Sequence, residues 1–122
     1  MARRSKNSTT ARELAVASAR IARDDNSEDI IILDLRGISP VTDYFVICTG
    51  TSGRQLQTVA DDIAKHGKQA GQKVWQVAGA QQAQWIVMDF VDVVVHLFDP
   101  EHRAYYDLEL IWGEAPRVEW ES

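Results

Sequence analysis

The stretch Tyr44-Phe45-Val46-Ile47-Cys48-Thr49-Gly50-Thr51-Ser52-Gly53 decides the fold, because it leads from a strand through a tight turn into a helix. Its first five residues form an apolar run that is typical of a strand covered on both faces. Ser52 followed three residues later by Gln55 is typical of a capping box. Apolar residues recur at helical spacing over 56–70, and Gly71 stands where a helix commonly ends.

The sequence on both sides of this unit predicts further strands and helices. In chain order the predicted elements are a helix over 10–24, strands over 30–35 and 44–48, a helix over 52–71, strands over 73–77, 85–90 and 93–98, and a helix over 99–113. The last two strands form a predicted hairpin around Val91-Asp92. The fold class is therefore α/β, bordering on α+β, with a single sheet of about five strands flanked by helices.

The length of 122 residues favours one domain rather than two. Residues 1–9 are polar and basic and are predicted to form a disordered arm, residues 10–113 form the domain, and residues 114–122 form a flexible tail. The single cysteine, Cys48, excludes an intramolecular disulfide and favours a reducing compartment. No apolar run approaches the roughly 20 residues of a membrane span, so we expect a cytoplasmic protein that does not bind membranes.

Charge is unevenly distributed along a chain whose formal net charge is −5. Residues 1–24 hold six Lys or Arg and two Asp or Glu, whereas residues 74–122 hold two basic and nine acidic residues. The acidic part would repel a phosphate backbone and would favour a basic protein partner. An acidic surface that only maintains solubility is the commoner explanation of such a charge.

The Gly50–Gly53 turn is a candidate nucleotide site, because a helix N-terminus presents free N–H groups to a phosphate. It lacks the Gly-Lys-Ser/Thr ending of a phosphate-binding loop, and the same residues suit an ordinary capped helix. Nucleotidyl transfer would also need two carboxylates one residue apart on a strand to bind two metal ions. Asp61-Asp62 lies in a predicted helix, and Asp89 and Asp92 are three residues apart. A nucleotide-binding or nucleotidyl-transfer enzyme therefore stays only as the alternative.

Other catalytic or metal-binding arrangements have less support. His96 and His102 could approach one another where the last strand meets the last helix, but two histidines without a third ligand do not predict a zinc site. Cys48 lies in an apolar strand and is expected to behave as an inert small hydrophobe. We expect no catalytic residue, no metal and no cofactor.

A surface for binding a partner is predicted on the hairpin and the last helix. In the strand over 85–90, Trp85 and Asp89 share one face, which mixes an aromatic ring with charge as interface centres do, although Trp85 suits a core position equally well. The candidate partner-binding residues are Trp85, Asp89, Asp92, His96, Arg103 and Tyr106.

Three blocks of sequence, residues 39–52, residues 85–96, and residues 105–109 with Trp112, resemble the ribosomal silencing factor family, also called Iojap-like proteins. The resemblance covers residues 10–113 and implies a mixed sheet similar to the nucleotidyltransferase fold but without its catalytic carboxylates. It also implies a function that is not enzymatic. Members bind the large ribosomal subunit through its fourteenth protein, on the face where the small subunit docks, and so repress translation under nutrient limitation. The motif positions expected to be structural are Asp43, Gly50, Ser52 and Gly79.

Two positions depart from the family pattern. Val91 stands where a glycine is usual, and Ala78 stands where an acidic residue is common before Gly79. Because valine resists a positive φ, the hairpin turn must differ from the usual one or be strained. The resemblance further implies possible homodimers, for which Trp85 and Trp112 would be suitable, and the basic arm could contact ribosomal RNA.

Overall fold

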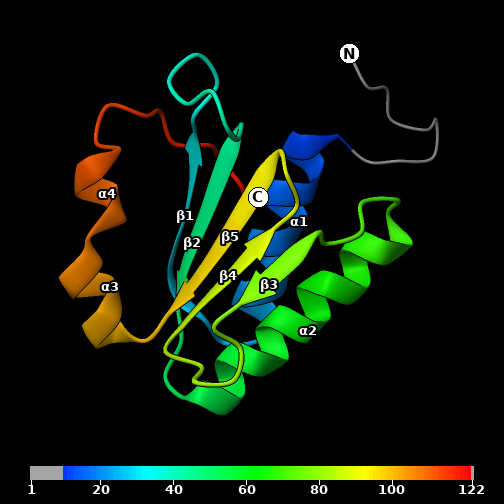
Figure 1. The fold of residues 1–122 in the computed structure, drawn as a ribbon, viewed down its shortest axis with the longest axis vertical. Helices are drawn as coiled ribbons and strands as arrows, with labels where there is room; N and C mark the ends of the chain where they lie inside the picture. The colour runs from blue at the N-terminus through cyan, green and yellow to red at the C-terminus, as the bar shows by residue number, and fades with distance from the viewer. Residues whose placement is uncertain (1–9, 122) are drawn as a thin grey trace.

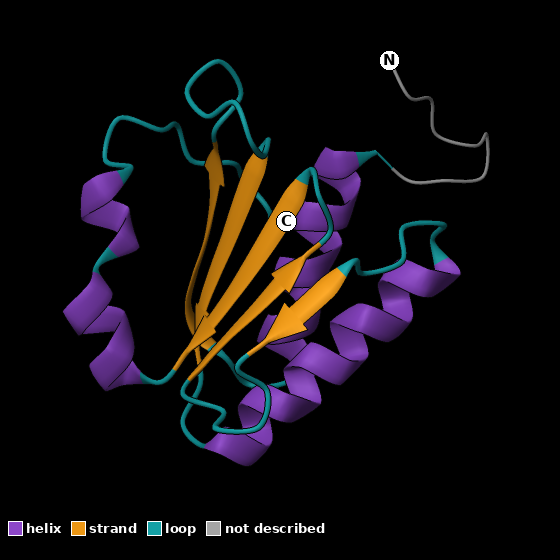
Figure 2. Ribbon diagram, viewed as in Figure 1, coloured by secondary structure: helices purple, strands orange, loops and turns teal. Residues whose placement is uncertain are grey.

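The computed structural model describes residues 10–121 as a five-stranded sheet with helices on both of its faces (Figures 1 and 2). In chain order the elements are α1 (Ala11–Asp24), β1 (Glu28–Asp34), β2 (Tyr44–Thr49), α2 (Gly53–Gln69), β3 (Gln76–Ala78), β4 (Trp85–Asp89), β5 (Val93–Phe98), α3 (Pro100–Tyr106) and α4 (Leu108–Ile111). The strand order is β1-β2-β5-β4-β3, and β2 runs parallel to β5 while the other neighbours are antiparallel. The predicted fold class, a mixed α/β sheet, is confirmed. None of the helices within residues 10–121 is long and apolar enough to span a membrane.

α1 and α2 cover one face of the sheet and enclose the larger core (Figure 1). α1 begins with the predicted capping box, in which Thr10 Oγ1 accepts a hydrogen bond from Glu13 N and Glu13 Oε1 accepts one from Thr10 N. α2 begins at the predicted cap, Ser52, but the side chain of Gln55 bonds to Thr51 instead of closing a second box. Side chains buried in this core include Leu14, Ile32, Val46, Leu56, Ile63, Ile86, Met88, Val95 and Leu97.

The opposite face carries a smaller core beneath α3 and α4 (Figure 1). Its buried side chains are Leu33, Leu35, Ile47, Phe98 and Ala115, with Phe45, Trp85, Leu108 and Trp112 packed against them. Side chains of β4 and β5 therefore alternate between two cores, as the sequence predicts for the hairpin.

The predicted last helix, over 99–113, is wrong in one respect, because it consists of two short helices. Asp107, between α3 and α4, has a left-handed backbone with φ 46° and ψ 58°. The apolar pattern did not reveal the break, because Leu108 and Trp112 still fall at helical spacing and both pack against the smaller core. A change of backbone conformation at one residue does not alter the spacing of the apolar residues.

The edge strand β3 lies later than the predicted range of 73–77. Its bounds follow from its partner, since Gln76 pairs with Asp89 at the end of β4 and Ala78 pairs with Val87. The pairing partner, not the local sequence, therefore sets the limits of this short strand.

The chain after α4 runs along the outer edge of β1, whereas the sequence predicts a flexible tail over 114–122. Asp34 N donates a hydrogen bond to Pro116 O at 2.8 Å, and Ala115 and Val118 are only 8% and 7% exposed. Residues 115–118 thus shield a strand edge that would otherwise be open to unwanted pairing. Two buried side chains form no periodic pattern, so the sequence did not reveal this contact.

The turn between β4 and β5 is strained, which is one of the two outcomes that the sequence predicts for a valine in this place. Val91 has φ +76°, and its side chain is 56% exposed. Its N–H donates a hydrogen bond to Asp89 Oδ1 at 2.7 Å, which helps to hold the turn. A β-branched residue in this region costs on the order of 1–3 kcal/mol.

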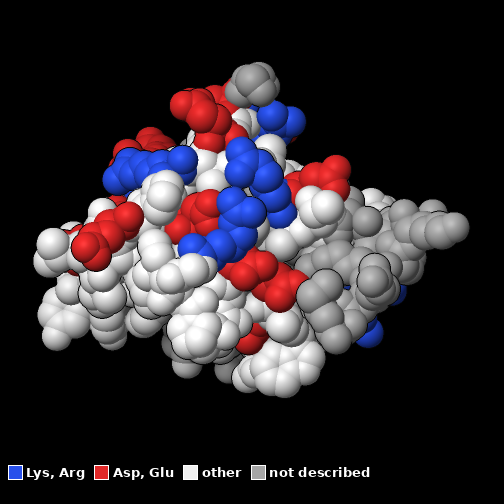
Figure 3. Space-filling model, turned by 90° about the horizontal axis from the view of Figure 1, so that it is seen from above, with Lys and Arg blue, Asp and Glu red and all other residues white. Residues whose placement is uncertain are grey.

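Charged side chains of both signs are interleaved at the end of the sheet that carries this turn (Figure 3). Arg36, for example, forms a bidentate pair with Asp34, with 2.8 Å between Nη2 and Oδ2. The charge is uneven along the sequence, but on this face of the described residues positive and negative side chains are mixed.

Candidate functional site

Three of the predicted partner-binding residues meet in an aromatic cluster between α3 and the sheet. The ring of Tyr106 packs on Trp85, with 4.5 Å between the ring centroids, and Trp85 stacks on Phe98 at 4.9 Å. Trp85 Nε1 donates a hydrogen bond to His96 Nδ1 at 3.1 Å. His96 is only 6% exposed, whereas Tyr106 is 42% exposed. Trp85 and His96 thus support α3 from beneath, and Tyr106 reaches the surface.

His96 is held neutral by its surroundings. Burial lowers the pKa of its imidazole from 6.5 to about 4. Because Nδ1 accepts the indole hydrogen bond, the proton of the neutral ring resides on Nε2, which has no hydrogen-bond partner among the described residues. The neutral ring suits its role as an acceptor for Trp85.

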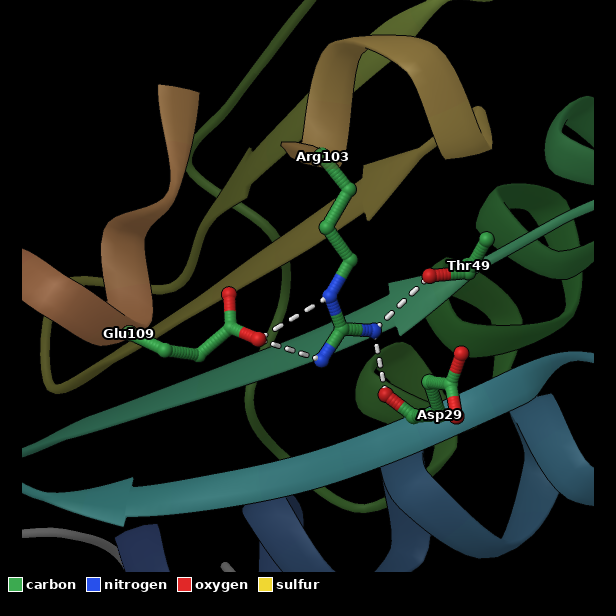
Figure 4. Close-up of polar contacts among 4 residues, drawn as sticks. All are labelled: Asp29, Thr49, Arg103 and Glu109. Atoms are coloured by element: carbon green, nitrogen blue, oxygen red, sulfur yellow. Dashed lines mark hydrogen bonds and ion pairs between the residues drawn. The ribbon is translucent and has the colours of Figure 1, made fainter. Parts of the chain in front are cut away.

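Arg103 points inward and joins four parts of the fold (Figure 4). Its Nη1 donates to Thr49 Oγ1 at 2.8 Å and to the backbone oxygen of Asp29, and its Nη2 donates to Glu109 Oε2 at 3.0 Å. The Arg103 side chain is 11% exposed and that of Glu109 is 28% exposed. The guanidinium therefore links α3 to α4, to the end of β2 and to the start of β1, and its donors are directed into the fold.

Asp89 and Asp92 lie at the other end of the hairpin from Trp85, so the six predicted residues do not form one patch. Asp92 O accepts hydrogen bonds from the backbone N–H groups of Asp43 and Tyr44, which joins the hairpin turn to the start of β2. Asp89 Oδ1 is used within the turn itself.

The glycines of the motif allow close approach of other groups. A Cβ added at Gly79, where φ is +82°, would lie 2.1 Å from Trp85 O, and one added at Gly50 would lie 2.5 Å from Leu56 Cδ2. Gly79 thus lets the chain enter the start of β4, and Gly50 makes room for the first turn of α2. The side chain of Ser52 caps the same helix, with its Oγ 3.1 Å from Gln55 N.

Part of the donor set at the Gly50–Gly53 turn is already engaged within the fold. Gln55 Oε1 accepts hydrogen bonds from both the N–H and the hydroxyl of Thr51. Asp25 and Arg54 line the shallow depression beside the turn, so this depression carries charges of both signs. Burial and the neighbouring carboxyl of Asp62 raise the pKa of Asp25 to about 6. The geometry therefore gives the nucleotide alternative no specific support.

The two histidines of the last strand and helix have separate partners. His102 Nδ1 lies 2.8 Å from Asp99 Oδ1, whereas His96 is bonded to Trp85. Within residues 10–121, no three His, Cys, Asp or Glu side chains lie close enough together to hold a metal ion. Burial raises the pKa of the Cys48 thiol to about 12, so this cysteine is not a nucleophile near neutral pH.

Comparison with known proteins decides the family. The family model described as "Ribosomal silencing factor during starvation" matches residues 8–122, which include every strand and helix described above. The chain belongs to the ribosomal silencing factor family. The ribosomal silencing factor of Bacillus subtilis is 43% identical over 99 residues, which are 81% of this chain and 84% of that protein.

Two further proteins are similar to this chain, one in structure and one in sequence. A crystal structure of a Chromobacterium violaceum protein superposes with a TM-score of 0.83 at 28% identity, covering 93% of this chain and 94% of that one. A mouse protein, "Mitochondrial assembly of ribosomal large subunit protein 1", is 34% identical over 95 residues, which are 75% of this chain and 42% of the mouse protein.

Sequence reasoning missed the partners that give Arg103 its place in this family domain. Thr49 and Glu109 hold its guanidinium, and Asp29 supplies a backbone oxygen, which no side-chain pattern could reveal. A signal was nevertheless present, because Arg103 is the only Lys or Arg between 100 and 111 and Glu109 follows it at a distance of six residues. A single basic residue among acidic and aromatic residues of two neighbouring helices indicates an ion pair with one of those acidic side chains.

Proposed function

We propose that this ribosomal silencing factor binds the large ribosomal subunit through its fourteenth protein, on the face where the small subunit docks, and so prevents the subunits from joining. The observation that carries the proposal is the family match over residues 8–122. The name of the mouse relative, which refers to assembly of the large ribosomal subunit, supports that subunit as the binding partner.

The proposed action is steric. A compact chain of 122 residues has a radius of gyration of about 14 Å. Specific protein interfaces are packed as closely as protein interiors, with room only for scattered water molecules. A domain of this size on the docking face would therefore keep the two subunits apart without any chemical step, as long as it stays bound. Repression of translation under nutrient limitation would then follow from occupancy of that face.

The predicted contact residues differ in how well they suit this task. Tyr106 is exposed and remains a proposed contact, as do Asp89 and Asp92 at the hairpin turn. The contacts of His96 and Arg103 suit them to supporting α3 rather than to touching a partner.

A subunit-joining experiment tests the proposal. Purified large and small subunits are mixed with and without the protein and separated on a density gradient. We expect the protein to migrate with large subunits and to reduce the peak of joined ribosomes in proportion to its concentration. An unchanged peak of joined ribosomes, with no protein beside the large subunits, would refute the proposal.

The competing hypothesis of a nucleotide-binding enzyme has its own test. A nucleotide that binds the folded chain with [L] 100 times Kd would stabilise it by about 2.7 kcal/mol and raise its melting temperature. We expect nucleoside triphosphates with magnesium to leave the melting temperature unchanged.

Three further elements complete the proposed function. The protein would act in the cytoplasm, where the subunits meet. It could also form a homodimer, for which light scattering is the test.

The basic arm over residues 1–9 lies outside the described residues. Its proposed contact with ribosomal RNA would appear as a lower salt dependence of subunit binding after deletion of residues 2–9.

A further inference from the structure

Four large apolar side chains are exposed within seven residues on α3 and α4. Tyr105 is 80% exposed, Tyr106 42%, Leu110 76% and Ile111 66%. Neither helix contains a buried residue, and both lie on the side of the sheet opposite α1 and α2 (Figure 1). Scattered apolar residues need no explanation on a protein surface, but a cluster of this kind is typical of a contact site. These four residues are called the α3–α4 surface below.

The α3–α4 surface is held firmly from behind. The hydrogen bonds of Arg103 to Thr49 and Glu109 join both helices to the end of β2 (Figure 4). The rings of Tyr106 and Trp85 lie 4.5 Å apart, and Trp112 packs against the smaller core just after α4. The helices that carry the exposed side chains are therefore held in place before a partner binds, and ordering them on binding would cost little free energy.

The charges around the surface are acidic. Glu101, Asp107 and Glu114 are exposed on or beside the two helices. The only Lys or Arg between 100 and 111 is Arg103, whose guanidinium is engaged with Glu109. An apolar centre with an acidic rim is complementary to a basic partner surface.

This charge distribution selects among possible occupants. RNA and anionic lipid would both be repelled by the acidic rim. A second copy that docked by the same surface would place two acidic rims against one another. We propose that the α3–α4 surface docks on a basic protein surface. Resting on the proposed function, we infer that this partner is a protein component of the large ribosomal subunit.

Cosedimentation with purified large subunits tests the apolar part of the surface. Leu110→Gln/Ile111→Gln removes two exposed side chains without disturbing a core contact, and we expect binding to weaken on the order of tenfold or more. Val41→Gln is the matched control, because Val41 is 79% exposed in the loop between β1 and β2, and we expect it to bind as the wild type does. Equal melting temperatures would show that all three chains are folded alike.

A charge reversal tests the nature of the partner. We expect Glu114→Lys to weaken binding several-fold at low salt and less at high salt, since exposed charges are screened. Asp61→Lys makes the same change on α2, on the opposite side of the sheet, and we expect it to leave binding unchanged.

Each outcome has a distinct meaning. If the wild type binds large subunits and the Leu110→Gln/Ile111→Gln variant binds equally well, the surface is refuted while the proposed function stands. If the apolar variant weakens binding but Glu114→Lys does not, the partner is not basic. If the apolar variant abolishes a homodimer and still binds subunits, the surface is a contact between copies and the inference fails. If the wild type binds no subunits, the proposed function and the inferred partner fall together.

Discussion

Acidification should weaken the fold through His96, and replacing His96 by asparagine should remove that part of the pH dependence. The imidazole of the unfolded chain takes up a proton below about pH 6.5, whereas burial keeps the folded one neutral down to about pH 4. Because the folded pKa is the lower one, the contribution is fully present above pH 6.5 and is lost as the pH falls through 4. The asparagine side chain keeps a hydrogen-bond acceptor for Trp85 Nε1 but does not titrate.

The magnitude follows from the two pKa values. Each pKa unit between the folded and the unfolded chain corresponds to about 1.4 kcal/mol, so the complete loss is about 3 kcal/mol, of which about 2 kcal/mol is reached by pH 5. Asp25 acts in the opposite sense, because its raised pKa of about 6 gives stability at low pH that is lost as the pH rises through 6. Asp25 is present in both chains, so the difference between them isolates His96.

The assay is urea unfolding followed by tryptophan fluorescence at pH 7.5, 6 and 5. The free energy of unfolding of the wild type should fall relative to that of His96→Asn by about 2 kcal/mol between pH 7.5 and 5. If the two chains lose stability in parallel, His96 titrates normally, and the burial argument for the aromatic cluster is wrong.

Three further substitutions test the turns and the ion pair by urea unfolding. Val91→Gly should raise the free energy of unfolding by about 1 kcal/mol, because glycine relieves the positive φ; a loss would show an unstrained turn. Gly79→Ala should lower it by about 2 kcal/mol or more, since the new Cβ meets Trp85 O; an unchanged value would contradict this close approach. Arg103→Met should lower it by about 3 kcal/mol, because Glu109 loses its counter-charge; a neutral effect would show that the pair is not needed.

The sheet and the two long helices were predictable because their signals are local. Thr10 with Glu13 marks the start of α1, and the apolar run over 44–48 marks β2. The break at Asp107 and the return of residues 115–118 to β1 were not predictable, because contacts distant in sequence decide them. Local sequence patterns indicate which face of a helix or strand is apolar. They do not indicate which distant residues contact its ends.

The candidate site was likewise predictable in part. Trp85 and His96 share one side of the sheet, as alternation along the two strands predicts, and Tyr106 packs on Trp85 from α3. Their depth was not predictable, because it depends on α3 lying over them. The role of Arg103 was hidden for the same reason, as two of its partners, Asp29 and Thr49, lie more than 50 residues away.

The proposed function places this chain on the docking face of the large ribosomal subunit. A density map of the protein bound to purified large subunits tests it most directly. We predict one copy on the face that receives the small subunit, with Leu110 and Ile111 of α4 against the fourteenth protein. Density on any other face, or a bound copy that leaves the docking face open to the small subunit, would contradict it.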